Sequence, residues 1–450
     1  MDLARLGWRP ILTIATFAML IQQAFSYVCQ LVMPILADRI AEDFGISRGW
    51  LGLYLFIQNS FAILAAMGCG GLILRYGPLR ISQMVLLLMA TSIFLISTGY
   101  IWLFPVSAVL LGMAAVSTPA SSQILARVCP PRLAPLVFSV KQTGVPVGSL
   151  IGGLMIPFLL GTVLYSATVG TTIRLGTYGA AFVTAVIVVA VALMLQPIRD
   201  YFDAERKPDT KLSFGDLSQT MRMVLDNPPV RDIAFAAFAF GGLQSLFAGF
   251  FILYLIDGLN YSEAQSGSIY AIASFSAIFA RIAWGVGGGV ISPRLILGLI
   301  GLTGALSALG LTQISASWNV FEVTVIAVLY NMTAISWHGI LLAEIARLAP
   351  KEQVGAVTGG VLSFTSVAMM IYPAIYGFLL ATTGSYRVGF LLGAIPSFAA
   401  FLIFIRAPVQ GPWGTALASS IRDQLQWRRA LIATMVLTTG VAIGWMTYWN

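Results

Sequence analysis

Residues 50–80 read WLGLYLFIQNSFAILAAMGCGGLILRYGPLR. No charged residue interrupts this stretch before Arg75, and about 20 mostly apolar residues are enough for a helix to cross a bilayer. A glycine cluster and a short loop that contains Arg75 and Arg80 end the stretch. It therefore predicts a membrane-spanning helix that leads into a positively charged loop.

The rest of the chain has the same character. Of its 450 residues 58% are apolar and only 9% are charged, whereas a soluble domain carries roughly 25% charged residues. This composition excludes a soluble enzyme, a nucleic-acid-binding protein and a disordered scaffold. The sequence also lacks catalytic triads, metal-ligand clusters and phosphate-binding loops at usable spacing. We therefore expect no enzymatic activity, no cofactor, no bound metal and no nucleic-acid partner.

Apolar stretches recur along the chain and predict an all-α membrane protein of two six-helix halves, residues 1–196 and 231–406. The expected spans are 10–36, 49–74, 81–98, 102–125, 135–160, 175–196, 231–256, 265–290, 294–313, 320–346, 354–381 and 388–406. Residues 197–230 form a polar and basic linker between the halves. Within it, residues 211–227 have the spacing of an amphipathic helix, which we expect to lie on the inner face of the membrane.

Residues 407–450 add a second linker and a further apolar run at 430–449. This run predicts a thirteenth transmembrane helix and places the C-terminus outside. Such a helix is either a passive anchor or a binding element for a partner membrane protein. Without that partner we expect the chain to be a monomer in the lipid bilayer.

The basic residues predict the orientation. The chain has 25 Lys and Arg residues and a net charge of +8. With the N-terminus inside, two basic residues fall within spans, nineteen lie on the inner side and four lie in outer loops, namely Arg39, Arg48, Arg174 and Arg387. Since Lys and Arg collect on the cytoplasmic side, we expect a cytoplasmic N-terminus and a bacterial inner-membrane location. The bias also accounts for the positive charge without an acidic partner.

The loop after the second span resembles a signature of the major facilitator superfamily, roughly G-x-L-a-D-R-x-G-R-R. Gly70, Leu72, Arg75, Gly77 and Arg80 match it or nearly match it. The resemblance implies that four of these residues, the two glycines and the two arginines, belong to the gate between the second and third helices.

The sequence departs from that signature at Leu74, where relatives carry Asp, and the departure weakens the gate interaction that the acid makes in relatives. Residues 141–153, KQTGVPVGSLIGG, resemble the fifth helix of the superfamily, and residues 337–360 are similar to the tenth helix and following loop of its bacterial members. A second glycine cluster followed by a basic loop, GVGGGVISPR, begins at Gly285 in the other half. The two halves are therefore expected to be related repeats.

The resemblance implies a secondary active transporter that moves a small solute by alternating access of the two halves. It is nearest to the branches that carry organic anions, monocarboxylates, oxalate and cyanate. Two alternatives stay open. One is efflux of a drug-like or cationic compound on the same fold, and the other is a membrane assembly factor or receptor that does not transport.

A glycine stripe marks the fifth span. Gly144, Gly148 and Gly152 recur every four residues, so one face of the helix is bare and lets another backbone approach closely. Pro146 and Pro157 are weak points at which the same helix could bend. We expect the stripe to serve helix packing, gating, or both.

Two basic residues lie inside predicted spans, where a charge costs about 2.5–3.5 kcal/mol on insertion scales. Arg281 lies roughly 13 Å from the inner end of the eighth span. It either binds a carboxylate or other oxyanion with two parallel hydrogen bonds or bonds structurally to backbone carbonyls. Lys141 lies roughly 9 Å inside the fifth span and either snorkels to the surface or shares the substrate cavity. The excess of buried positive charge favours an anionic substrate.

Three residues are candidates for coupling transport to protons. His338 is the only histidine and is either a bonded core imidazole or a pH-sensitive cavity residue. Glu344 and Glu322 lie near the ends of the tenth span, whereas the first six spans carry no acidic residue away from their ends.

Further polar groups at cavity depth complete the predicted substrate site. Each of them alone is more often a bond between helices than a ligand. With Arg281 and Lys141, the substrate-binding candidates are Gln142, Tyr27, Gln30, Asn59, Gln244, Asn331, His338 and Tyr372. Gln22, Gln23, Gln58, Gln123 and Trp337 lie at similar depth and belong to the same polar path.

Overall fold

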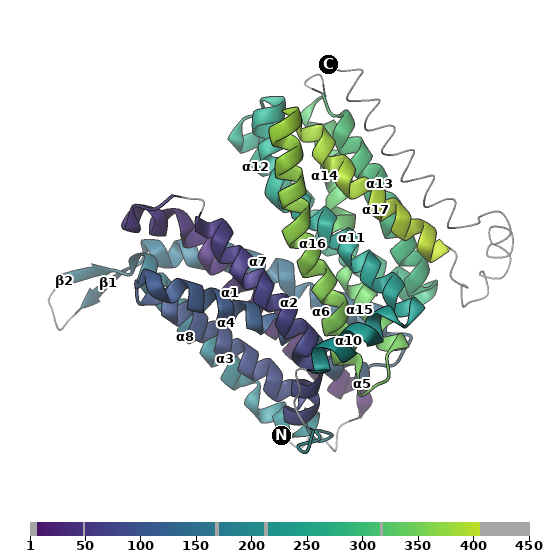
Figure 1. The fold of residues 1–450 in the computed structure, drawn as a ribbon. Helices are drawn as coiled ribbons and strands as arrows, with labels where there is room; N and C mark the ends of the chain where they lie inside the picture. The colour runs from purple at the N-terminus through teal and green to yellow at the C-terminus, as the bar shows by residue number, and fades with distance from the viewer. Residues whose placement is uncertain (1–6, 48–49, 167–170, 211–214, 316–317, 406–450) are drawn as a thin grey trace. The chain divides into compact units, whose positions relative to one another are not determined.

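A computed structural model of the chain describes residues 7–47, 50–166, 171–210, 215–315 and 318–405. Twelve helical segments in this part of the chain are long and apolar enough to cross a membrane, which confirms the twelve predicted spans (Figure 1). The predicted thirteenth helix at 430–449 lies outside the described residues.

The first half contains six spans, three of which are interrupted. The uninterrupted spans are α1 (Trp8–Phe44), α2 (Trp50–Tyr76) and α3 (Pro78–Ser97). The fourth consists of η2 (Ile101–Leu103), α4 (Phe104–Met113), η3 (Ala114–Val116) and α5 (Ser117–Val128). The fifth consists of α6 (Ala134–Gln142) and α7 (Gly144–Gly161), and the sixth of α8 (Gly176–Met194), η4 (Gln196–Ile198) and α9 (Arg199–Phe202).

The second half follows the short linker helix α10 (Gly215–Leu225). It begins with α11 (Pro228–Leu253), which ends in a π-helical turn, η5 (Tyr254–Gly258). The remaining helices are α12 (Glu263–Val290), α13 (Pro293–Gln313), α14 (Val320–Ala334), α15 (His338–Leu348), α16 (Val354–Thr383) and α17 (Tyr386–Ile405). The structure thus splits the predicted tenth span into α14 and α15.

One element departs from the predicted all-helical chain. A short antiparallel hairpin, β1 (Val163–Ser166) and β2 (Thr171–Arg174), joins α7 to α8 in the loop that the sequence places outside. Its strands are four residues each, so the protein remains essentially α-helical.

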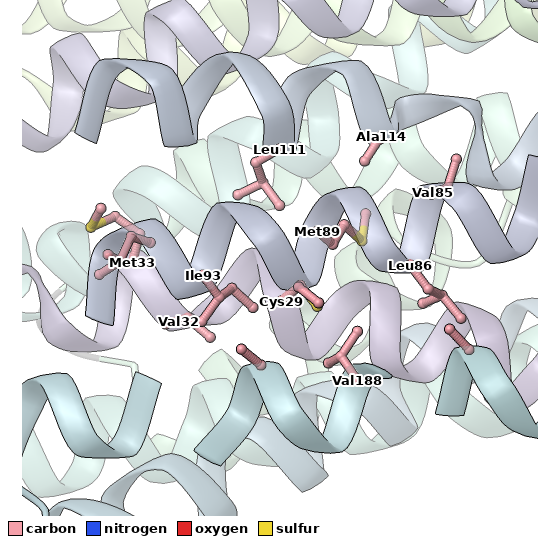
Figure 2. Close-up of a cluster of buried hydrophobic side chains, with 14 of the residues drawn as sticks. Cys29, Val32, Met33, Val85, Leu86, Met89, Ile93, Leu111, Ala114 and Val188 are labelled. Carbon is pink, nitrogen blue, oxygen red and sulfur yellow. The ribbon is translucent and has the colours of Figure 1, made fainter. Parts of the chain in front are cut away.

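The core of the first half consists of apolar side chains from helices that lie side by side. Figure 2 shows Cys29 and Val32 of α1, Met89 of α3, Leu111 of α4 and Val188 of α8 directed into one cluster. These residues are at most 3% exposed. Lipid supplies no hydrophobic drive between helices, so their close fit depends on van der Waals packing.

The chain forms two compact units that differ from its sequence halves. Unit 1 contains Met1–Val230 and Ile345–Ser366, and unit 2 contains Arg231–Glu344 and Val367–Asn450. A segment of the second half, the end of α15 and the start of α16, therefore belongs to the same unit as the first half.

The linker helix α10 forms where the amphipathic pattern predicts, but its apolar face contacts protein. Val224 is fully buried and Thr220 is 2% exposed. A Cβ added to Gly360 of α16 would lie 2.7 Å from the Thr220 side chain and 2.8 Å from the Val224 side chain. One added to Gly68 of α2 would lie 3.6 Å from Leu217. Helices of unit 1 therefore cover part of this face, at Val224 and Thr220.

Candidate functional site

In unit 1 a buried lysine is the centre of a polar cluster. Lys141 of α6 is fully buried and its Nζ donates to Gln23 Oε1 at 2.6 Å. Thr118 of α5 donates to the same oxygen at 3.1 Å. The ammonium group is therefore held inside the bundle by Gln23 of α1, which Thr118 of α5 also contacts, so the snorkelling interpretation of Lys141 does not apply in this structure.

The break between α6 and α7 places this lysine. Pro146 has no N–H group and its ring clashes with the carbonyl four residues earlier, that of Gln142, which is the last residue of α6. Directly after the break, Gly144 lets α7 approach α1, since an added Cβ would lie 2.6 Å from Leu20 O. An added Cβ at Gly148 would overlap the carbonyl of Ala24. The glycine stripe thus packs directly on α1.

Next to Lys141 the polar face of α1 continues toward α5. Gln22 Nε2 donates to Ser117 Oγ at 2.6 Å, and Ser26 and Ser117 hydroxyls lie 3.3 Å apart. Gln22 Oε1 is buried and has no hydrogen-bond partner among the residues that the structure describes. A buried acceptor without a donor is costly, so this oxygen is a position where a ligand hydroxyl or a water would be stabilised.

The other candidates of unit 1 lie in different surroundings. Gln142 is 2% exposed and Tyr27 is half-buried. Gln30 is exposed, and Asn59 donates to the carbonyl of Leu55 on its own helix at 2.8 Å. Asn59 therefore bonds to its own helix. Gln22 and Gln23, which the sequence also places at cavity depth, belong to the cluster around Lys141.

In unit 2 the second buried cation lies at the break between α14 and α15. Arg281 of α12 is 1% exposed and donates through Nη2 to the carbonyl of Ile335 at 2.9 Å. This bond is of the kind expected if Arg281 has a structural role and bonds to backbone carbonyls. A guanidinium has five N–H donors, so a bond to one carbonyl does not by itself prevent it from binding an anion.

Neighbouring side chains satisfy the other carbonyls at this break. Trp284 Nε1 donates to Met332 O at 3.1 Å, and Trp337 Nε1 donates to Ala334 O at 3.0 Å. Ser336 Oγ donates in the opposite direction, to Ala277 O of α12 at 3.0 Å. The last carbonyls of a helix have no partner within it, and in a membrane water cannot replace that partner. These contacts are therefore what permits α14 to end inside the bundle.

Unit 2 also contains buried polar atoms without a partner. Among the described residues, both amide atoms of Asn331, the hydroxyl of Tyr372 and Oε1 of Gln244 are buried and have no hydrogen-bond partner. Asn331 is fully buried and Tyr372 is 2% exposed. Gly242 permits the position of Tyr372, because an added Cβ would overlap its ring. These groups offer donors and acceptors to a polar ligand.

The three coupling candidates have different environments. His338 stacks on Trp337 with ring centroids 3.7 Å apart, and its Nδ1 lies 3.4 Å from Ile335 O. Glu344 is fully buried with Oε1 3.9 Å from Arg294 Nη1. Glu322 is exposed and caps α14, where it accepts from Asn319 N–H at 2.9 Å. Its position at a helix start corresponds to a capping box, so only His338 and Glu344 lie within the bundle.

Sequence analysis did not identify the acid that organises the loop after α2. Asp203 accepts hydrogen bonds from Leu79 N–H at 2.7 Å and Arg80 N–H at 2.9 Å, both in the first turn of α3. Burial raises the pKa of Asp203, while the two backbone N–H groups lower it. The sequence does indicate that an acceptor is needed here, because a helix that begins after Gly77 with Pro78 has N–H groups without an intrahelical partner.

The linker also contacts the positions of the gate motif. Gly77 has a φ of 93°, and an added Cβ would overlap the Asp203 carboxyl group. The carbonyl of Leu74 accepts from Lys207 N–H at 2.8 Å, and Arg75 donates to Thr210 O at 3.4 Å. The residues after the sixth span thus bind the loop from which the usual Asp is missing.

Comparison with known proteins agrees with this architecture. The sequence profile described as Major Facilitator Superfamily matches residues 12–359. The "Agnestins efflux protein AgnL12" of Paecilomyces divaricatus is 24% identical over 369 residues, which cover 80% of this chain and 77% of that protein. The "Hexuronate transporter" of Bacillus subtilis (strain 168) is 25% identical over 428 residues, or 87% of this chain and 94% of that protein.

Solved structures share the fold. The human organic anion transporter MFSD10 has a TM-score of 0.67 and 16% identity, and the match covers 89% of this chain and all of that one. A bacterial homologue of the iron transporter ferroportin, in an outward-facing state, has a TM-score of 0.70 and 13% identity over 88% of this chain and 98% of that one. The chain therefore belongs to the major facilitator superfamily and is an integral membrane protein with a transporter fold, not an enzyme.

Proposed function

We propose that the chain is a secondary active transporter that moves a small organic anion by alternating access of its two halves. We further propose that it does so in a bacterial inner membrane, with a cytoplasmic N-terminus. The observation that supports the anion most is the complete burial of Lys141 and near-complete burial of Arg281 within membrane-spanning helices. Charges at such positions are expensive and usually mark the path of a substrate or ion.

Each cation has the chemistry that a carboxylate needs. The planar guanidinium of Arg281 matches a carboxylate in two parallel hydrogen bonds, and the ammonium of Lys141 supplies a compact positive charge. Because Arg281 also bonds to Ile335 O at the end of α14, an anion on this guanidinium would act directly on the helix break. Binding and movement of the tenth span would then be linked.

The unpartnered polar atoms favour an anion that also carries hydroxyl groups. Gln22 Oε1 and Gln244 Oε1 are acceptors, and Asn331 offers one donor and one acceptor. The hydroxyl groups of a hydroxylated carboxylate pair with such donors and acceptors, and its carboxylate pairs with a buried cation. The similarity to a protein named as a hexuronate transporter agrees with this chemistry, because a hexuronate is a sugar with one carboxylate.

We assign proton coupling to Glu344 and His338. Both lie on α15, and Glu344 is buried next to Arg294, which also binds Asp232 at 2.9 Å. Protonation of Glu344 would weaken its attraction to the guanidinium, and this is the type of change that couples a proton to helix movement.

Efflux of a larger, drug-like compound is the alternative function. The similarity to a protein named as an efflux protein supports it at nearly the same level of identity. The two proposals differ in their dependence on charge. Efflux of a neutral or cationic compound would survive the loss of Arg281, whereas anion binding would not.

A thermal-shift experiment separates these functions. Purified protein is heated with glucuronate, with glucose as its uncharged counterpart, and with small monocarboxylates, dicarboxylates and organic cations. A ligand at a hundred times its Kd stabilises the fold by about 2.7 kcal/mol, which is readily detected. We expect a carboxylate to raise the Tm of the wild type and of Arg39→Gln, which loses an exposed charge, but not of Arg281→Gln. Equal shifts of all three proteins by a neutral or cationic compound would contradict the anion proposal.

A further inference from the structure

The two halves of the sequence meet inside unit 1. Residues 345–366 of the second half belong to this unit, where the start of α16 contacts α2 through small residues. A Cβ added to Gly70 would lie 2.6 Å from the Ala356 Cβ, and one added to Gly359 would overlap the carbonyl of Ala66. The two backbones are thus in direct contact at the end of the bundle that the basic residues predict to be cytoplasmic.

One buried glutamine joins the halves by two hydrogen bonds at this contact. Gln123 of α5 is 1% exposed. Its Nε2 donates to the carbonyl of Lys351 at 2.5 Å, and its Oε1 accepts from the N–H of Gly355 at 2.7 Å. The first N–H groups of a helix have no intrahelical acceptor, and Gly355 lies in the first turn of α16. A single amide therefore supplies the acceptor that the first turn of α16 requires and a donor to the turn directly before it.

Other contacts across this interface are weaker or lack direction. Lys207 and Glu352 form an ion pair at 2.5 Å, but the side chains are 56% and 63% exposed, and exposed pairs contribute little. The Cys69 thiol lies 3.6 Å from Gly355 O, inside the contact. Gln123 is the polar contact that is shielded from water and fixed in geometry by two partners.

We propose that Gln123 is a positioning residue of the transport cycle, an uncharged latch that holds the start of α16 on the first half. When Gln123 releases Lys351 and Gly355, α16 can leave α2 and the predicted cytoplasmic end can open. The inference depends on the alternating-access part of the proposed function and is independent of the substrate. In this chain the side-chain amide of Gln123 on α5 thus binds the start of α16. This contact lies close to the loop in which Leu74 stands where relatives carry Asp.

The buried thiol of Cys69 makes the latch measurable without a known substrate. Full-length protein with Cys29→Ala and Cys129→Ser retains Cys69 as its single cysteine. In inside-out membrane vesicles, N-ethylmaleimide reacts with Cys69 only when α16 moves away from α2. The reaction rate therefore reports the fraction of time that the interface is open.

Gln123→Leu preserves the approximate side-chain volume and removes both hydrogen bonds. We expect the labelling rate to rise about 30-fold, the shift in equilibrium that two net hydrogen bonds provide. Gln123→Glu keeps an acceptor for Gly355 N–H, which a carboxylate at a helix N-terminus favours, but loses the donor to Lys351 O. Its rate should lie between those of the parent and the leucine variant, so it tests the latch even if the leucine variant folds poorly.

Gln83→Leu is the matched control. Gln83 is also buried and its Nε2 also makes two hydrogen bonds, to Ala192 O and Gln196 Oε1, both at 3.0 Å, but both partners lie in the first half. We expect the parental labelling rate for this variant. A parental rate in Gln123→Leu, or an equal increase in Gln83→Leu, would overturn the latch. A raised rate in Gln123→Leu alone would support it even if no anion is transported, so the two proposals fail separately.

Discussion

Asp203 shows how one residue organises a loop that the family signature leaves incomplete. Its carboxylate binds two N–H groups at the start of α3, and Gly77 allows the approach because it has no Cβ and adopts a φ of 93°. The sequence revealed the loop and the missing acid at position 74. It showed that the start of α3 needs an acceptor but not which residue supplies it, because Asp203 lies more than a hundred residues away and has no periodic pattern.

The raised pKa of Asp203 predicts a pH dependence of stability. Burial is the main cause of the increase, so the folded protein binds this proton more tightly than the unfolded chain does. Between the ordinary pKa of a carboxyl group and the raised value, stability should therefore fall as the pH rises. Asp203→Asn has no ionisable group at this position and should lack that part of the slope.

The measurement is the Tm in detergent across the acidic range for the wild type and for Asp203→Asn. Asp200→Asn provides the control, because its side chain is 95% exposed and it lies on α9, the short helix directly before Asp203. Parallel slopes for the wild type and Asp203→Asn would contradict the role of burial at Asp203.

At the scale of the helices, the length of the apolar stretches predicted the spans, and the spacing of small residues predicted a close contact between helices. The twelve spans and the stripe formed by Gly144, Gly148 and Gly152 could be predicted from the sequence, and Pro146 marked the break before α7. The break between α14 and α15 was not predicted, because no proline lies there. It depends on donors such as Arg281 and Trp284, which come from another helix.

The linker helix illustrates a second limit at this scale. Its periodicity correctly indicated an amphipathic helix, but periodicity does not say what covers the apolar face. In the structure Val224 lies against α16 and Leu217 lies against α2. Only the tertiary contacts distinguish a helix that lies on lipid from one that lies on protein.

The contact between α7 and α1 gives a test at the same scale. Gly148→Ala places a methyl group against the carbonyl of Ala24, so the helices must separate and the protein should lose about 1–3 kcal/mol of stability. Gly153→Ala is the control, since no atom lies within 4 Å of an added Cβ there and alanine is the better helix former. Thermal unfolding should show a lower Tm for Gly148→Ala and an equal or higher Tm for Gly153→Ala. The reverse order would show that the stripe is not a packing contact.

At the scale of the whole molecule, the fold and the transporter class follow from composition, span number and family signature. The substrate does not follow from them, because it depends on a few buried groups. The sequence identified both buried cations, Lys141 and Arg281, through their cost in a membrane. It also placed Gln22 and Gln23 at cavity depth, but polar residues in spans are common, and only their contacts show which of them lie beside a cation.

Uptake into proteoliposomes tests the central claim, transport of an organic anion that depends on Arg281, most directly. Radiolabelled glucuronate is offered to vesicles loaded with unlabelled glucuronate, and glucose serves as the uncharged counterpart. We predict saturable exchange of glucuronate but not of glucose by the wild type and Arg39→Gln, reduced exchange by Arg281→Lys and none by Arg281→Gln. Exchange of glucose at the rate of glucuronate, or full glucuronate exchange by Arg281→Gln, would contradict the account.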